Sequence, residues 1–193
     1  NGTIDIYLPK SYGPNFRGGS SVVEANVNSA NLLEKRTCKS IDFIDFLKIF
    51  SSEDESLYDS LQFIRNERIR SIEDSYSDVP EYRFVLAEVK LHWAVLDFRF
   101  GHRIKSFREA IGAYQLLEEN RKRYPEFILT KKSMAMFHAL IGAIPERYRW
   151  GVKLISGMEG SIEQGLSEIT EVMEWSKDRS PHFYKESLIA KAY

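Results

Sequence analysis

Histidine and carboxylate side chains are the groups in this sequence that could bind a metal ion or transfer a proton. The four histidines are His92, His102, His138 and His182, and no two of them form an HxxxH or HExxH pair. Glu88 precedes His92 by four residues, which places both on one helix face. A carboxylate-bridged di-metal site needs Glu-x-x-His from two helices. We therefore expect Glu88 and His92 to form a structural salt bridge or an exposed pair, and we predict no metal site.

Acid–base, nucleophilic and cofactor chemistry have no support from motifs. The sequence does not separate Glu88 and Asp97, as an acid–base pair, from ordinary surface charges. The single cysteine, Cys38, is more typical of a small buried residue than of a nucleophile, and it excludes an internal disulfide. No GxSxG sequence supports a catalytic serine. The glycines at 157, 160 and 165 follow no predicted strand, so helix capping is preferred to dinucleotide binding. We predict no catalytic residue and no cofactor.

Composition excludes further classes of protein. The chain has 193 residues, of which 43% are hydrophobic and 28% are charged, as is ordinary for a folded domain. A net charge of −1 gives no overall field to attract nucleic acid or an anionic membrane. No apolar run approaches the roughly 20 residues of a membrane helix. The basic cluster of residues 121–123 and 131–132 fits a solvated helix end better than a nucleic-acid contact. We predict no nucleic-acid partner and no membrane span.

The stretch from Tyr82 to Phe100 carries the strongest helical pattern. At about 100° per residue, its apolar side chains form two stripes on opposite sides of a helix. One stripe holds Tyr82, Val85, Leu86, Val89, Trp93, Leu96 and Phe100, and the other holds Phe84, Ala87, Leu91, Ala94, Val95 and Phe98. The polar seams between them hold Arg83, Lys90 and Asp97 on one side and Glu88, His92 and Arg99 on the other. Two stripes predict packed neighbours on both sides of this helix.

Local signals place the ends of this helix and of the next one. Pro80 suits a first helical turn, and Gly101 suits a left-handed C-cap. Ser106 can act as the N-cap of the following helix, with Glu109 completing a capping box, and Pro125 ends it. The unit is therefore a helical hairpin.

The rest of the chain follows the same pattern. Helices are predicted over residues 40–50, 56–75, 131–144, 145–155 and 161–177, with a weak helix over 22–36. The helix over 161–177 begins with a capping box of Ser161 and Gln164. Ser180-Pro181 begins a last helix that the chain end cuts short, so we expect the domain to be truncated at its C-terminal end. Residues 1–20, rich in glycine and proline, predict an extended or flexible arm.

Helix pairs that recur at about 40 to 50 residues are typical of helical solenoids. The hairpin resembles the tetratricopeptide signature W-x2-L-G…Y…A-x3-F…P. The matching residues are Trp93 and Leu96 before the turn and Ala110, Tyr114, Leu117 and Pro125 after it. Asp97 stands where the signature has glycine, and the second helix exceeds the usual period. The chain therefore resembles a divergent tetratricopeptide-repeat-like (TPR-like) array.

A more specific resemblance covers about residues 40–190 and leaves residues 1–38 unmatched. Its segments are Leu86–Gly101, Ala113–Phe127, His138–Gly165 and Phe43–Ser56, which are similar to uncharacterised TPR-like proteins of Bacteroidetes bacteria. The resemblance supplies no catalytic residues. It implies an interaction scaffold and favours the bacterial envelope or periplasm over the cytoplasm.

Together these patterns predict an all-α protein in which antiparallel helical hairpins stack into a right-handed TPR-like solenoid of about eight helices. The repeat domain is expected over residues 21–193. We expect a non-enzymatic scaffold that binds a protein or peptide in a helical-repeat groove, with His92, Arg99 and Arg103 as candidate groove residues. The alternatives are an accessory subunit of an envelope transport or secretion assembly and a small-ligand-binding helical domain.

Overall fold

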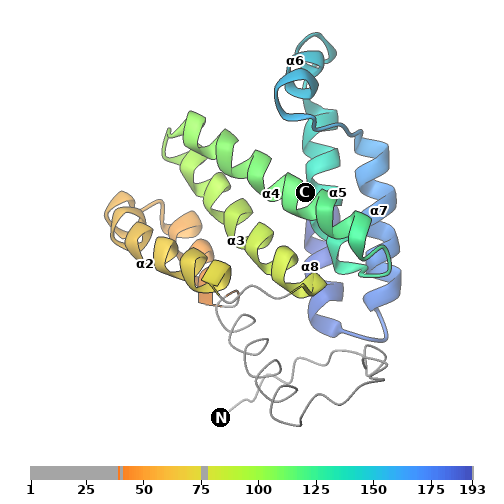
Figure 1. Ribbon diagram of the computed structural model, residues 1–193, viewed down its shortest axis with the longest axis horizontal. Helices are drawn as coiled ribbons and strands as arrows, with labels where there is room; N and C mark the ends of the chain where they lie inside the picture. The colour runs from red at the N-terminus through yellow and green to blue at the C-terminus, as the bar shows by residue number, and fades with distance from the viewer. Residues whose placement is uncertain (1–38, 40, 75–77, 193) are drawn as a thin grey trace. The chain divides into compact units, whose positions relative to one another are not determined.

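The computed structural model describes residues 39, 41–74 and 78–192. Within this part of the chain there are eight helices and no strand, which confirms the predicted all-α class (Figure 1). The arm predicted over 1–20, the weak helix predicted over 22–36 and Cys38 lie outside the described residues. The described chain forms two compact units, one ending at Phe127 and the other beginning at Ile128. A single repeat domain over 21–193 stays a prediction.

Four helices make up the first unit among its described residues. They are a helix over residues 41–52, α2 (Glu55–Asp74), α3 (Pro80–Arg99) and α4 (Arg103–Arg123). Helical periodicity alone locates the first three to within a turn. Helix α3 lies between α2 and α4 and packs against both, as its two apolar stripes predict (Figure 1).

The ends of α3 follow from local chemistry. Pro80 occupies the first turn, where its missing N–H removes no helical hydrogen bond. The helix ends at Arg99, and Gly101 has a φ of 85°, a left-handed conformation that glycine adopts without a Cβ clash. The backbone N–H of His102 then donates to the Asp97 carbonyl at 2.7 Å. Gly101 is therefore the turn of the predicted α3–α4 hairpin.

The polar seams of α3 are largely buried, which the sequence pattern does not indicate. Arg83 and Glu88 keep only 3% and 4% of their surface exposed, and Asp97 keeps none. In contrast, Phe98 from the second apolar stripe is 64% exposed in the last turn of the helix. Helix α3 is thus enclosed on its polar seams as well as on its apolar stripes.

The predicted capping role of Ser106 is wrong. Helix α4 begins at Arg103, so Ser106 lies inside its first turns, with His102 at the N-cap position. The Ser106 hydroxyl donates to the Ala94 carbonyl of α3 at 2.7 Å. Glu109 does not complete a capping box, because its carboxylate pairs with Arg65 of α2. Both side chains join α4 to other helices.

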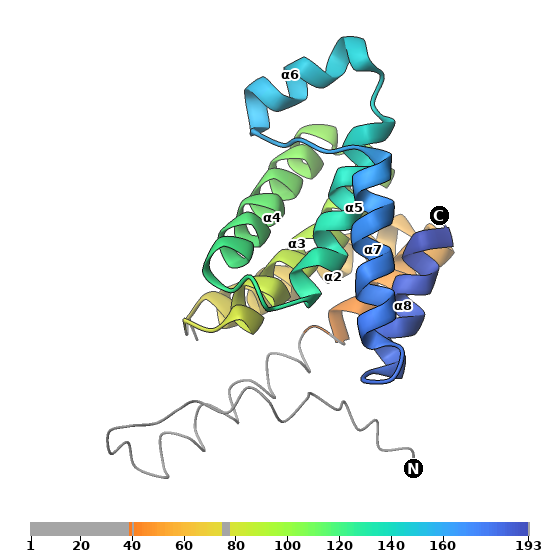
Figure 2. The same ribbon diagram turned by 90° about the vertical axis from the view of Figure 1, so that its right-hand side faces the viewer.

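The second unit contains α5 (Leu129–Ala143), α6 (Glu146–Ser156), α7 (Ile162–Ser176) and α8 (Pro181–Ala192). Helix α7 lies between α5 and α8 and packs against both (Figure 2). Ser161 is the N-cap of α7, and its hydroxyl oxygen accepts a hydrogen bond from the Gln164 backbone N–H at 3.1 Å. The Ser161 half of the predicted capping box is confirmed. The Gln164 side chain donates to Glu168 instead.

Three glycines allow the helices of this unit to approach closely. A Cβ added at Gly165 of α7 would lie 2.6 Å from the Ala135 carbonyl oxygen of α5. A Cβ at Gly142 would collide with the backbone of Ser161 and Ile162, and one at Gly160 would collide with His138. No side chain fits at these positions unless the backbone moves, so the hydrogen atom of glycine sets the distance between α5 and α7.

We predict that Gly165→Ala destabilises the second unit by about 1–2 kcal/mol, because overpacking against a backbone carbonyl outweighs the better helix propensity of alanine. Gly151→Ala in α6 is the matched control, since nothing lies within 4 Å of its added Cβ. The control is expected to be neutral or to stabilise by up to about 1 kcal/mol. Urea unfolding followed by circular dichroism measures both. A Gly165→Ala protein as stable as the wild type would contradict the tight α5–α7 contact.

Candidate functional site

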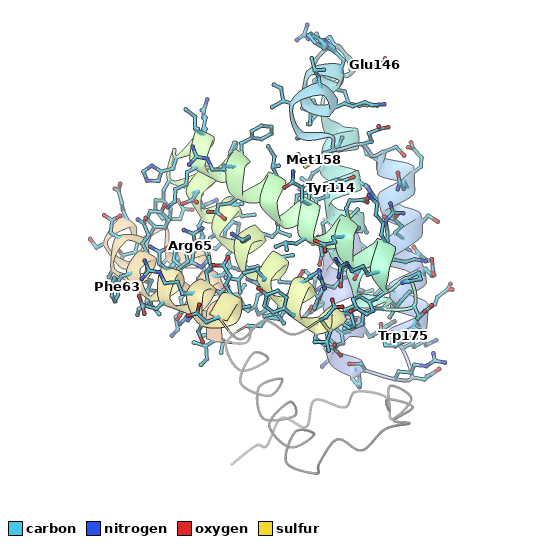
Figure 3. The ribbon with its side chains drawn as sticks, in the orientation of Figure 1. Phe63, Arg65, Tyr114, Glu146, Met158 and Trp175 are labelled. Atoms are coloured by element: carbon cyan, nitrogen blue, oxygen red, sulfur yellow. The ribbon has the colours of Figure 1, made fainter. Side chains whose placement is uncertain are left out.

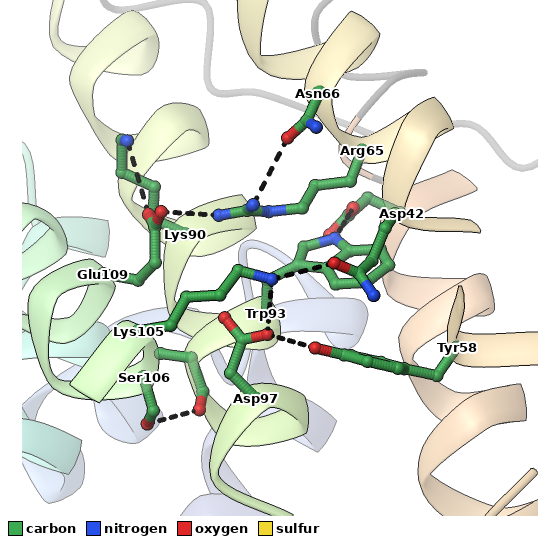
Figure 4. A network of polar contacts seen from close by, with 12 residues as sticks. Asp42, Tyr58, Arg65, Asn66, Lys90, Trp93, Asp97, Lys105, Ser106 and Glu109 are labelled. Carbon is green, nitrogen blue, oxygen red and sulfur yellow. Dashed lines mark hydrogen bonds and ion pairs between the residues drawn. The ribbon is translucent and has the colours of Figure 1, made fainter. Parts of the chain in front are cut away.

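The densest group of titratable side chains lies where α3 meets the helix over 41–52, α2 and α4. Figure 4 shows its central part. Phe63 and Arg65 of α2 show which side of this helix faces the group. Phe63 is 72% exposed and points outward, whereas Arg65 is 5% exposed and points toward α3 (Figure 3). We call this group the α3 polar network, and its carboxylates are those of Asp42, Glu88, Asp97 and Glu109.

Asp42 anchors the helix over 41–52 to α3. Its side chain is fully buried, and its Oδ1 accepts a hydrogen bond from Trp93 Nε1 at 2.9 Å. The His92 Nδ1 lies 2.9 Å from its Oδ2, and Arg68 NH1 of α2 lies 3.6 Å from its Oδ1. The His92 ring also stacks on Phe46, with ring centroids 4.9 Å apart. One carboxylate thus joins three helices.

Asp97 forms the second centre, with partners from α2 and α4. The Tyr58 hydroxyl donates to Asp97 Oδ1 at 2.5 Å, and the Lys105 ammonium lies 2.9 Å from the same oxygen. Lys105 also donates to Gln62 Oε1 at 3.0 Å. Burial raises the pKa of Tyr58 well above its ordinary value of 10.0, and the hydrogen bond to the Asp97 carboxylate and its charge raise it further. Tyr58 is therefore held as a neutral donor.

Two further carboxylates complete the network. Arg65 NH2 lies 2.7 Å from Glu109 Oε1, and Lys90 Nζ lies 3.5 Å from Glu109 Oε2. Burial raises the pKa of Glu109, but the nearby charges and hydrogen bonds of Arg65 and Lys90 outweigh it and hold the pKa below its ordinary value. Glu88 pairs with Lys39 at 3.2 Å. Each carboxylate therefore has a cation from a neighbouring part of the first unit.

These contacts give the network a structural role. A buried charge is tolerated only when it is paired and hydrogen-bonded, and each carboxylate of the network has at least one such partner. Asp97 Oδ2 is buried and has no hydrogen-bond donor among the described residues. Within the same residues, no group of three or more His, Cys, Asp or Glu side chains is arranged to hold a metal ion.

The structure separates the three candidate groove residues. His92 keeps only 12% of its side chain exposed and contacts Asp42, so it lies within the α3 polar network. Its i, i+4 neighbour Glu88 pairs instead with Lys39. Arg99 pairs with Glu53, and its guanidinium lies 4.8 Å from the centroid of the Phe50 ring. Arg103 is exposed at the start of α4.

Sequence patterns do not predict the roles of Asp42, Tyr58 and Lys105. Asp42 offers one signal, because it interrupts a dense apolar run and a buried tryptophan such as Trp93 needs a hydrogen-bond acceptor. The partners are far apart in sequence, so no local spacing indicates the pairing.

The second unit has an apolar pocket between α5, α7 and α8. Its lining includes Met136, Ala139, Gly165, Leu166, Ile169 and Ala190. Met136 and Leu166 are 39% and 44% exposed. Leu140 and Ile162, one helical turn from them, are 59% and 44% exposed and extend the apolar surface. We call these four exposed side chains and the pocket between them the α5–α7 surface.

Comparison with known proteins gives no family assignment. The chain matches no protein-family model, and neither the curated proteins nor the solved structures yield a match to it. Within the described residues, no helix combines the length and apolar character needed to cross a membrane.

We predict that Asp42→Ala destabilises the first unit by about 3–5 kcal/mol, because it leaves the Trp93 N–H buried without its acceptor and removes the buried charge that pairs with Arg68. Asp59→Ala is the matched control. Asp59 is exposed on α2, and its carboxylate accepts only from Gln62, at 3.1 Å, so the change should stay within about 0.5 kcal/mol. Urea unfolding followed by circular dichroism measures both. Equal effects of the two substitutions would contradict the role of Asp42.

We predict that the first unit loses stability at alkaline pH because of Tyr58. Its folded-state pKa is raised, so its contribution is complete below the ordinary pKa of 10.0 and is lost as the pH rises toward the folded-state pKa. Above pH 10 the unfolded chain releases the phenol proton while the folded chain keeps it. The free energy of unfolding should therefore fall more steeply above pH 10 in the wild type than in Tyr58→Phe. Parallel pH profiles from urea titrations would show that Tyr58 is not the group responsible.

Proposed function

We propose that this protein is a non-enzymatic scaffold that binds a protein or peptide non-covalently on a surface made by packed helices. The single observation that carries the proposal is the α5–α7 surface. Contiguous apolar side chains on the outside of a protein mark interaction sites more often than isolated ones do. The pocket between the helices is small, so it suits a short aliphatic anchor from a partner, as in helix-in-groove recognition.

The distribution of polar groups supports the same proposal. In the α3 polar network the buried carboxylates and cations stabilise the packing of helices. The α5–α7 surface is instead apolar and partly open, so burial of apolar area is the source of affinity that we assign to it.

The stacking of hairpins also belongs to the proposal. We infer a TPR-like array in which α3 and α4 form one hairpin. The positions of Trp93 and Leu96 before the turn and of Ala110 and Tyr114 after it support this inference, as does the resemblance to TPR-like proteins of Bacteroidetes bacteria.

The test uses the whole chain as bait in extracts of its source organism, with two variants beside the wild type. Leu140→Lys/Leu166→Lys places two charges on the α5–α7 surface, while Ile104→Lys changes a side chain of α4 that is 80% exposed. A partner should be captured by the wild type and by Ile104→Lys, and lost from the double variant. With that partner purified, the dissociation constant should rise at least about tenfold in the double variant, the loss expected for apolar anchors. Equal binding by all three proteins would overturn the proposal.

A further inference from the structure

Helix α6 lies in the segment that connects α5 to α7. The end of α5 and the start of α7 are in direct contact, because Gly142 meets the backbone of Ser161 and Ile162. Residues 143–159 therefore connect two points of the pair that lie close together. Helix α6 stands apart from the bodies of α5 and α7 (Figure 2).

The apolar face of α6 is directed outward. On the opposite side of the helix, Arg149 NH2 donates to the carbonyls of Gly142 and Ile144 at 3.1 and 3.2 Å and ties α6 to the end of α5. Trp150, Leu154 and Ile155 are 68%, 76% and 72% exposed. An amphipathic helix ordinarily turns such a face toward a core. In α6 these three apolar side chains are instead exposed.

Basic side chains flank this face. Arg147 and Lys153 lie three residues before and after Trp150, on either side of it, and Glu146 is the single acidic residue of the helix. Beyond the helix, Lys153 pairs with Glu159 at 2.8 Å, with both side chains more than 60% exposed. A pair exposed to this extent is weak and exchanges readily for another anion. The acidic Glu163 lies further along, in the first turn of α7.

We propose that α6 docks in the interfacial region of an anionic phospholipid surface. Trp150 and Leu154 would enter the boundary between headgroups and acyl chains, and Arg147 and Lys153 would reach lipid phosphates. An amphipathic helix with a tryptophan on its apolar face and cations beside it has the composition of helices that lie in the membrane plane. This role is local, so the net charge of −1 for the chain does not oppose it.

The size of the face argues against a second copy of the chain as its occupant. Eleven residues make a helix about 16 Å long, and one face of it offers far less than the roughly 800 Å² per partner of a stable protein interface. A lipid surface has no such minimum, because a small apolar area and a few cations give weak, reversible binding. The proposal does not rest on the scaffold function or on the α5–α7 surface.

The experiment mixes the full chain with vesicles of phosphatidylcholine alone or with an equal amount of phosphatidylglycerol. The wild type should sediment with the anionic vesicles at low salt, less at high salt, and at least about tenfold less with phosphatidylcholine alone. Lipids brominated in the acyl chains should quench the fluorescence of the wild type but not that of a Trp150→Phe variant, which keeps Trp93 and Trp175.

Variants assign the binding to α6. Trp150→Ala/Leu154→Ala should lower vesicle affinity at least about tenfold, and Arg147→Gln and Lys153→Gln roughly fivefold each. Ile104→Ala, equally exposed on α4, is the matched control and should bind as the wild type does. Circular dichroism should show all variants folded.

The proposal is overturned if neither kind of vesicle binds, if both bind equally, or if the α6 double variant binds as well as Ile104→Ala. Loss of a protein partner from the α6 double variant, with no vesicle binding by the wild type, would also overturn it and would assign α6 to a protein groove.

Discussion

Compensation of buried charge on α3 is the constraint on which the first unit depends. Asp97 is fully buried, and Arg83 and Glu88 are nearly so. A buried carboxylate without a partner would cost several kcal/mol, so each neighbouring helix must arrive in a register that supplies a cation or a donor. Asp42 fixes the helix over 41–52 in this way, and Tyr58 fixes α2. The apolar stripes bring the helices together, while the charged groups select one arrangement among the many that apolar packing would allow.

In the second unit, glycine residues determine how two helices pack together. Gly142, Gly160 and Gly165 let the backbones of α5 and α7 approach so closely that no Cβ fits between them. His138 adds one polar contact across this pair, with its Nδ1 2.5 Å from Glu168 Oε2. Close backbone contact gains dispersion energy over a short length, but it leaves the outer apolar side chains of both helices open. The α5–α7 surface is thus a consequence of how the pair is joined.

Sequence periodicity locates the helices and Gly101 because those signals are local. It does not distinguish a solvated polar side chain from a buried one, because burial depends on a partner that lies far away in the sequence. The pairing of Asp42 with Trp93 is such a case. The same limit explains Ser106, which fits an N-cap by spacing yet is used to bridge α4 and α3. Phe98 shows the opposite error, because helical angle assigns it to a core-facing stripe although it is largely exposed in the last turn. Long-range partners decide all three cases.

Helix α6 shows why direction is harder to predict than helicity. Its periodicity is amphipathic, and an amphipathic helix is ordinarily assumed to turn its apolar side inward. Two contacts at the end of α5 explain why α6 differs. Gly142 fixes where the chain leaves α5 and returns to α7, and Arg149 donates from α6 to the carbonyls at the end of α5. With Arg149 held there, Trp150 and Leu154 face outward. Exposure of this kind loses the stabilisation of burial within the fold, so a surface that covers α6 would recover it.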